Sequence, residues 1–208
     1  MKPEMARVVV IGTSCVGKTT FAKSLARVFS FPYVELDALY WQPNWIPRPL
    51  EEFRALTAQA LAQDHWVTDG NYTVVRELMW SRATTIIWLN HDFPLVLWRA
   101  LTRTVRRALT QEELFSGNRE SLRMAFFSRE SILWWVITTF HRRRKQYRRL
   151  FNTKPFPGLE YIEFTTPAES QSFLKGLQTT VQTTGIIEQK NHAERNPETH
   201  RAHFHPGR

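Results

Sequence analysis

The chain has 208 residues, of which 42% are hydrophobic, and its 28 Lys and Arg against 19 Asp and Glu give a formal net charge of +9. This length suits one compact domain with room for a core, while apolar stretches such as Ile132 to Ile137 are too short to cross a bilayer. One cysteine excludes an internal disulfide, and the N-terminus resembles a strand more than an export signal, so we expect a cytoplasmic protein without membrane contact.

The first predicted strand, Val8 to Ile11, leads directly into a phosphate-binding pattern with two glycines followed by Lys and Thr. Glycines let the backbone curl until N–H groups point at phosphate oxygens, and the positive end of the next helix adds to that field. Lys18 then reaches the β and γ phosphates, and the Thr19 hydroxyl can ligate magnesium. The predicted nucleotide-binding residues are Gly12, Thr13, Ser14, Cys15, Val16, Gly17, Lys18, Thr19 and Thr20. The alternative for the whole segment is a glycine turn that binds no ligand. Cys15 is either a small side chain that fills space in the loop or a thiol that can be oxidised.

The predicted strands alternate with helical patterns. Further short buried strands are expected at Tyr33 to Leu36, Trp66 to Thr68, Thr85 to Leu89 and Tyr161 to Phe164, and a helix begins near Pro49 with Phe53, Leu56, Ala60 and Leu61 inward. This alternation predicts a parallel sheet covered on both faces, with a ligand site at the carboxyl ends of the strands. Gly12, Asp37 and Asp69 all lie at such ends.

The segment after the second strand reads Glu35-Leu36-Asp37-Ala38-Leu39-Tyr40-Trp41 and ends in Pro43-Asn44-Trp45. The Asp37 carboxylate can orient an acceptor hydroxyl and take its proton during phosphoryl transfer, with Trp41 and Trp45 as walls for a flat or apolar acceptor. Alternatively, Asp37 caps a turn and the tryptophans belong to the core.

The third strand ends in Asp69, followed by Gly70-Asn71-Tyr72. An acidic residue at the end of a buried strand beside a phosphate loop is where NTPases hold magnesium, directly or through water. We therefore predict Thr19 and Asp69 as the metal-binding pair.

From Phe93 to Phe151 the pattern is helical and strongly basic, with thirteen Arg or Lys and four Glu between Arg99 and Arg149. Such a segment is either a polyanion-binding surface or a lid that clamps phosphates. Leu97, Leu101, Val105 and Ala108 share one helical face, and Arg99, Arg103 and Arg106 share the opposite one. Farther on, Arg144 lies on an apolar side, where it needs either a carboxylate partner or a phosphate.

The sequence Gly117-Asn118 interrupts the helical pattern and is followed by Arg119 and Arg123 on one side of a new helix. These arginines either neutralise charge on a transferring phosphoryl group or are ordinary solvated side chains. At the other end of the chain, residues 183–208 are polar with no apolar face, so we expect a disordered tail whose four histidines are solvated or bind a metal.

Together these blocks carry a resemblance to a known family. The phosphate loop, E-L-D-A-L-Y-W with P-N-W, D-G-N-Y, G-N-R-E-S and T-F-H-R-R-R-K-Q-Y are similar to bacterial adenylate-kinase-related P-loop proteins, some of which carry the label "DNA topology modulation protein". The similarity covers about residues 6 to 177.

The resemblance implies a three-layer α/β P-loop NTPase fold with a five-stranded parallel sheet of the nucleoside-monophosphate-kinase type. The kinase-like domain would span residues 1–182, with a basic helical lid at about 110–150. It also implies that the loop holds ATP phosphates, that Asp69 serves magnesium, and that lid arginines close over the phosphates. Those arginines would be Arg119, Arg123, Arg142 and Arg143.

One departure from true adenylate kinases bears on the acceptor. Their third-strand motif continues Asp-Gly-Phe-Pro-Arg, and its arginine grips the phosphate of the acceptor, whereas here Asp69-Gly70 is followed by Asn71-Tyr72. The position of Asp37 is similar instead to that in shikimate- and gluconate-type kinases, which phosphorylate a hydroxyl.

The sequence thus predicts an ATP- and magnesium-dependent phosphotransferase acting on a small-molecule acceptor, as a monomer or homodimer. Lys18, Asp37 and the lid arginines would carry the catalysis. Two alternatives stay open: a nucleic-acid-associated P-loop protein whose basic helices grip DNA, and a nucleotide-dependent regulator without catalysis.

Overall fold

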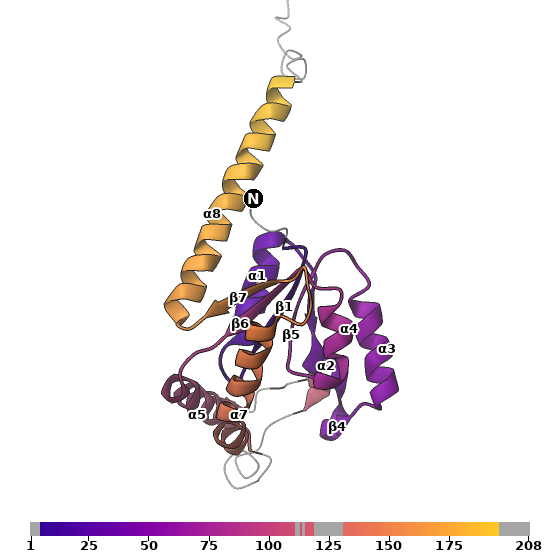
Figure 1. Ribbon diagram of the computed structural model, residues 1–208, viewed down its shortest axis with the longest axis vertical. Coiled ribbons are helices and arrows are strands. Elements are labelled where there is room, and N and C mark those ends of the chain that lie inside the picture. The colour runs from indigo at the N-terminus through magenta and orange to yellow at the C-terminus, as the bar shows by residue number, and fades with distance from the viewer. Residues whose placement is uncertain (1–4, 111–112, 114, 119–130, 196–208) are drawn as a thin grey trace, which may run out of the picture.

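The computed structural model describes residues 5–110, 113, 115–118 and 131–195, and it shows a parallel sheet between layers of helices (Figure 1). The strands pair in the order β2-β5-β1-β6-β7, all in parallel. Their bounds are β1 Arg7–Gly12, β2 Tyr33–Glu35, β5 Trp66–Asp69, β6 Thr85–Leu89 and β7 Glu160–Phe164. The predicted three-layer α/β fold with a five-stranded parallel sheet of the nucleoside-monophosphate-kinase type is confirmed.

Helices connect the strands and cover both faces of the sheet. They are α1 Lys18–Phe29, α2 Leu36–Tyr40, α3 Leu50–Ala60, α4 Arg76–Trp80, α5 Phe93–Thr110, α7 Ile132–Thr153 and α8 Pro167–Arg195. A small antiparallel hairpin of β3 Trp41–Gln42 and β4 Ile46–Pro47 follows α2. Short 3-10 helices are η1 Pro43–Trp45, η2 Thr73–Val75 and η3 Phe115–Gly117.

The central strand β1 explains why the sheet is buried on both sides. Val8, Val9 and Val10 have no exposed surface, as expected for a β-branched strand with helices on either face. Because side chains alternate along a strand, Val8 and Val10 pack with α1, α5 and α8, while Val9 and Ile11 pack with α3 and α4. Helix α7 contributes to both clusters.

The register of the parallel strands brings their carboxyl ends together. Val10 of β1 lies opposite Asp69 of β5, and Asp69 lies opposite Glu35 of β2. On the other side of β1, Gly12 lies opposite Leu89 of β6. The predicted strand ends therefore meet at one edge of the sheet, where α/β proteins bind their ligands.

The buried side of helix α5 lies between its apolar stripe and its arginine face. Leu101 and Val105 are each 39% exposed, whereas Arg99 and Arg103 are half-buried. The core is met instead by Val96, Ala100 and Thr104, each without exposed surface. Arg99 and Arg103 are partly covered because the arginine face of α5 lies beside the phosphate loop. The Val16 carbonyl of that loop accepts a hydrogen bond from Arg99.

Two segments named from the sequence, the lid and the polar tail, overlap with helices of the structure. Residues 132–150, assigned to the lid, form most of α7, and Val136, Phe140 and Tyr147 on it are buried in the body of the domain. Residues 183–195, expected to be a disordered tail, continue α8, which extends beyond the sheet (Figure 1). Residues 196–208 lie outside the described part of the chain. No described helix is both long and apolar enough to span a membrane.

The packing of α1 gives a test of the fold. Leu25 on α1 is fully buried in the core cluster beneath the sheet, so we expect Leu25→Ala to lower the free energy of unfolding by about 2–5 kcal/mol. Leu50, at the start of α3, is 48% exposed, and Leu50→Ala should cost less than about 1 kcal/mol. Urea denaturation of both variants measures the difference; equal losses would contradict the assigned position of α1.

Candidate functional site

The phosphate loop joins β1 to α1 at the carboxyl edge of the sheet. Cys15 and Gly17 adopt positive φ angles of 63° and 108°, which curl the backbone before α1 begins at Lys18. Residues Ser14 to Thr20 line a pocket of about 1180 Å³. Gly12 and Thr13 precede this stretch, and the Thr13 carbonyl accepts a hydrogen bond from Lys18 Nζ at 3.0 Å.

Gly12 is required by its surroundings as well as by its φ of 154°. A Cβ atom at this position would lie 2.7 Å from the carbonyl oxygen of Leu89 and 2.8 Å from Cγ1 of Val16. Because the first of these is backbone of the neighbouring strand β6, it cannot move aside cheaply. The loop can leave the sheet at this point only with glycine.

Asp69 ends β5 directly against the start of α1. Its Oδ2 accepts a hydrogen bond from the Thr19 hydroxyl at 2.9 Å, and its Oδ1 accepts one from the Tyr33 hydroxyl at 2.5 Å. Asp69 is 6% exposed, and burial raises its pKa, while Lys18 and the two hydroxyl donors act in the opposite direction. The predicted metal pair Thr19 and Asp69 is therefore brought together in the described structure.

A carboxylate and a hydroxyl with phosphate oxygens are ligands that suit magnesium, which keeps several waters and takes few protein ligands. Among the described residues, no group of three or more His, Cys, Asp or Glu side chains is arranged to hold a metal ion. The residues present thus fit a magnesium ion held mainly by nucleotide and water, with Thr19 and Asp69 as its protein contacts.

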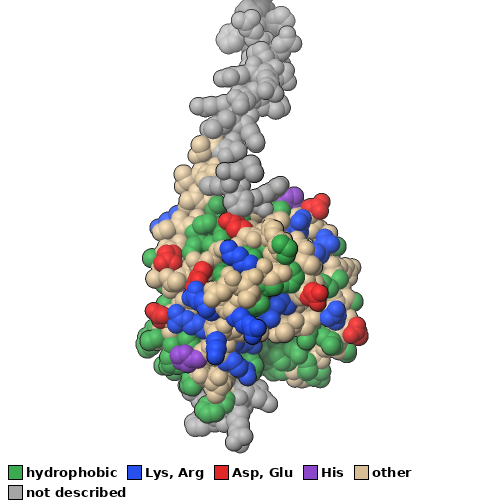
Figure 2. All heavy atoms as spheres, viewed as in Figure 1, with side chains coloured by type: hydrophobic (Ala, Val, Ile, Leu, Met, Phe, Trp, Pro, Cys, Tyr) green, Lys and Arg blue, Asp and Glu red, His purple; other side chains and the backbone are tan. Residues whose placement is uncertain are grey.

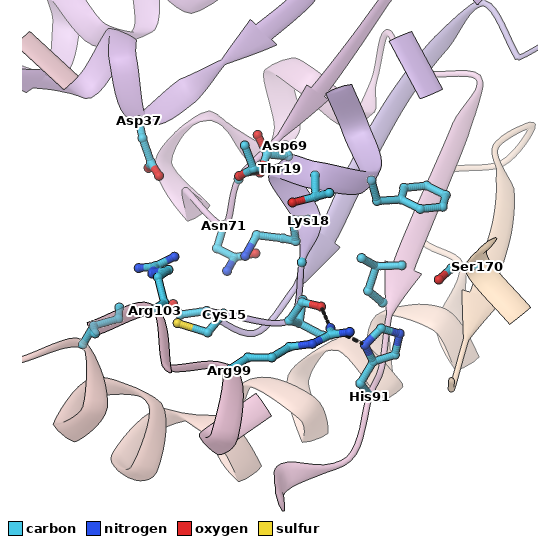
Figure 3. Close-up of a pocket in the computed structure, with 18 of the residues that line it drawn as sticks. Cys15, Lys18, Thr19, Asp37, Asp69, Asn71, His91, Arg99, Arg103 and Ser170 are labelled. Carbon is cyan, nitrogen blue, oxygen red and sulfur yellow. Dashed lines mark hydrogen bonds between the residues drawn. The ribbon is translucent and has the colours of Figure 1, made fainter. Parts of the chain in front are cut away.

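Asp37 lies across the pocket from the phosphate loop, on the short helix α2 (Figure 3). Its Oδ1 accepts a hydrogen bond from the Tyr72 hydroxyl at 2.6 Å. Tyr72 and Trp41 line the pocket, and their rings flank Tyr40, with centroid distances of 4.8 Å to each. Asp37 therefore faces the pocket beside aromatic walls.

Trp45 does not form a wall of the pocket as predicted. Its ring meets that of Trp41 edge to face at 5.6 Å, but Trp45 is not among the residues that line the pocket. Its backbone N–H donates to Asn118 Oδ1 at 2.9 Å, and Asn118 Nδ2 donates to the Gln42 carbonyl. The Gly117-Asn118 sequence thus ties its segment to the β3-β4 hairpin.

Arginines close the other side of the pocket. Arg99, Arg103 and Arg106 reach it from α5, and Arg143 reaches it from α7. Arg99 Nη1 donates to the Val16 carbonyl at 2.6 Å and lies 3.2 Å from His91 Nδ1 (Figure 3). This contact holds the phosphate loop from the side opposite the sheet.

The charges around Lys18 are mutually dependent. Burial lowers the pKa of Lys18, and the neighbouring carboxylates of Asp69 and Asp37 oppose this change. The guanidinium of Arg143 lowers the pKa of Lys18 further, because two cations repel each other. An anion entering this part of the pocket would relieve that repulsion and restore favourable solvation of both cations.

The other arginines expected from the sequence are placed differently. Arg119 and Arg123 lie outside the described residues, and Arg142 is exposed on α7 and does not line the pocket. Arg144 pairs with Asp92 at 3.4 Å, which is the carboxylate alternative of its two predicted partners. The guanidinium of Arg76 lies over the ring of Trp80, 5.6 Å from the ring centroid.

Several site residues were not identified from the sequence. Arg99, Arg103 and Arg106 had been noted only as one helical face, and their spacing of four and three residues was the signal available. The sequence gives no role for Asn71, whose Nδ2 donates to the Gly12 carbonyl at 2.7 Å. Tyr33 had no signal, because its contact with Asp69 joins residues far apart in the chain.

Comparison with known proteins adds little to this geometry. No family model and no curated protein matches the chain. Among solved structures, it is similar to a gluconokinase from Sinorhizobium meliloti 1021, with 17% identity over 89% of this chain and 99% of that chain and a TM-score of 0.49. A shikimate kinase from Bacteroides thetaiotaomicron gives 17% identity over 86% and 99%, with a TM-score of 0.48. A sugar kinase from Janibacter sp. HTCC2649 gives 17% over 86% and 94%, with a TM-score of 0.43.

These likenesses concern the fold alone, and they do not confirm the resemblance to adenylate-kinase-related proteins or to those labelled for DNA topology. The sheet order, the phosphate loop and the residues around it define the class: an α/β protein with a P-loop kinase-like fold.

The contact between His91 and Arg99 predicts a pH dependence of stability. Burial, followed by the Arg99 guanidinium, lowers the pKa of His91 below its usual 6.5. The unfolded chain therefore binds a proton in a pH range where the folded chain does not, and the free energy of unfolding falls as pH drops through that range. Urea denaturation at about pH 7.5 and about pH 5.5 should show a smaller loss for His91→Gln than for the parent.

His141 is exposed on α7 and provides the matched control. His141→Gln should lose as much stability on acidification as the parent. If His91→Gln behaves in the same way as His141→Gln, the assigned environment of His91 is wrong.

Proposed function

We propose that this protein is an ATP- and magnesium-dependent phosphotransferase whose acceptor is a hydroxyl group of a small molecule. The observation that carries the proposal is the convergence of Lys18, Asp37, Asp69 and Arg143 on one pocket, each from a different element of the fold. Phosphoryl transfer needs this combination, because the protein must position donor and acceptor and stabilise charge on the transferred group.

In this proposal the residues have separate tasks. Backbone N–H groups of the loop and the Lys18 ammonium bind the terminal phosphates of ATP. Thr19 and Asp69 hold magnesium, which when bound neutralises charge on the phosphate oxygens. Arg143 and the α5 arginines Arg99 and Arg103 stabilise the charge of the transferred group. The sequence assigned this role to Arg119 and Arg123, which lie outside the described residues.

Asp37 is assigned to the acceptor. Tyr72 donates to its Oδ1, which fixes the plane of the carboxylate and leaves Oδ2 as the atom we assign to the acceptor hydroxyl. That oxygen would orient the hydroxyl and accept its proton as the new P–O bond forms. The aromatic rings of Trp41 and Tyr72 would pack against the body of the acceptor.

The residues after Asp69 support a hydroxyl acceptor over a nucleoside monophosphate. Asn71 and Tyr72 occupy the positions at which adenylate kinases continue toward their phosphate-gripping arginine. Here both side chains are engaged within the protein, Asn71 with the Gly12 carbonyl and Tyr72 with Asp37. Arg76, the next arginine along the chain, does not line the pocket and so does not replace the phosphate-gripping arginine of adenylate kinases.

Replacement of Lys18 tests nucleotide binding. Lys18→Ala removes the ammonium that would contact the phosphates, so we expect ATP with magnesium to bind about 10- to 100-fold more weakly than to the parent. Lys23 is on the same helix, pairs with Glu35 and is absent from the pocket lining, so Lys23→Ala should bind ATP like the parent. Calorimetry measures both; parent-like affinity in Lys18→Ala would refute the proposed site.

A second candidate function, binding of nucleic acid, has one observation in its favour. Figure 2 shows a band of Lys and Arg side chains on the face that carries α7, and Arg142, Lys145 and Arg149 of that helix are exposed. Such a band can contact a phosphate backbone.

Titration with duplex DNA at two salt concentrations separates the two functions. Under the phosphotransferase proposal, we expect weak binding that is the same in the parent and in Lys145→Ala. Tight binding with a steep salt dependence, weakened in Lys145→Ala and indifferent to ATP, would favour the nucleic-acid function instead.

A further inference from the structure

A buried tyrosine hydroxyl connects the start of the phosphate loop to helix α7. Tyr147 is 1% exposed, and its hydroxyl donates to Asn71 Oδ1 at 2.7 Å. Asn71 in turn donates through Nδ2 to the Gly12 carbonyl at 2.7 Å. The same tyrosine oxygen accepts a hydrogen bond from Arg143 Nη1 at 3.4 Å. A continuous hydrogen-bonded series thus runs from Gly12 to Arg143.

The guanidinium of Arg143 is held on a second side as well. It lies over the ring of Trp135, 5.4 Å from the ring centroid and about two helical turns earlier on α7. Both contacts come from α7 itself, which packs into one core cluster through Val136 and Phe140 and into the other through Tyr147. Arg143 is therefore supported by a rigid element and not by a loop.

The position of Arg143 relative to Lys18 indicates what it contacts. Both line the same pocket, and like charges are placed together where an anion binds between them. Since Lys18 of a phosphate loop reaches the β and γ phosphates, the anion nearest both is the terminal phosphate.

We propose that Tyr147 is a positioning residue, which holds Arg143 against the γ-phosphate and, through Asn71, keeps that arginine in fixed register with the phosphate loop. This inference rests on the proposed function. It adds that Arg143 distinguishes the triphosphate from the diphosphate and that Tyr147 positions Arg143 for this contact. Arg143 makes the phosphate contact, and Tyr147 acts through Arg143 without touching the ligand.

The test compares two nucleotides that differ at the γ position. Dissociation constants for AMP-PNP, a non-hydrolysable triphosphate, and for ADP are measured by calorimetry with magnesium present, and their ratio is the readout. Arg143→Met removes the charged contact to the γ-phosphate, so it should reduce the preference for AMP-PNP about tenfold. Tyr147→Phe removes only the hydrogen bond that positions Arg143, so it should reduce that preference about threefold. In the Arg143→Met background, Tyr147→Phe should have no further effect on the ratio.

A purely structural role for Tyr147 would weaken both nucleotides equally and leave the ratio unchanged. Tyr161→Phe is the matched control, since the Tyr161 hydroxyl bonds only to the backbone of Phe156 among the described residues and lies outside the pocket lining. An unchanged ratio in Tyr147→Phe, or an equal effect with and without Arg143, would overturn the proposal while the proposed function stands. If the parent binds neither nucleotide, both are overturned.

Discussion

The hydrogen bond from Thr19 to Asp69 is the interaction on which the rest of the site depends. It joins the first turn of α1 to the end of β5, and it forms because β5 pairs with β1 in a register that sets Val10 opposite Asp69. A shift of one residue in that pairing would turn the carboxylate to the other face of the sheet. The proposed metal contacts of Thr19 and Asp69 depend on this one alignment.

The same alignment concentrates groups that are costly to bury. Lys18 and Asp69 are each disfavoured in their charged forms by burial, and each is partly compensated by the other. Arg143 adds a second cation at the same place. Proteins accept such local instability at sites where a ligand supplies the missing interactions, and the stability of the remaining core must cover it. Here the two core clusters on either face of β1 provide that stability.

Sequence patterns were sufficient wherever the information was local. The strands were found because β-branched runs such as Val8 to Ile11 mark a buried parallel strand, and the loop was found because its residue types follow a phosphate-binding spacing. Asp37 and Asp69 followed from their place at strand ends. The topology then brought these residues to one pocket, as parallel connections require.

Patterns failed where the answer depended on which neighbour a helix meets. Periodicity places Arg99 and Arg103 on one side of α5, but it does not say whether that side faces solvent or the phosphate loop. The buried side of α5, with Val96, Ala100 and Thr104, lies between the apolar stripe and the arginine face. Arg99 reaches a backbone carbonyl of the loop, a contact that no periodicity contains. Contacts such as Tyr147 with Asn71 join residues 76 positions apart, so no local pattern contains them.

The grip of Arg99 on the Val16 carbonyl has a kinetic and entropic consequence. Together with the contact of Asn71 with the Gly12 carbonyl, it fastens the curled loop at two points through groups of the protein itself. A preorganised loop loses little conformational entropy when it binds a ligand, so more of the interaction energy contributes to affinity. For the proposed nucleotide, encounter would then be governed by diffusion into a positively charged pocket and not by the time the loop needs to close around its ligand.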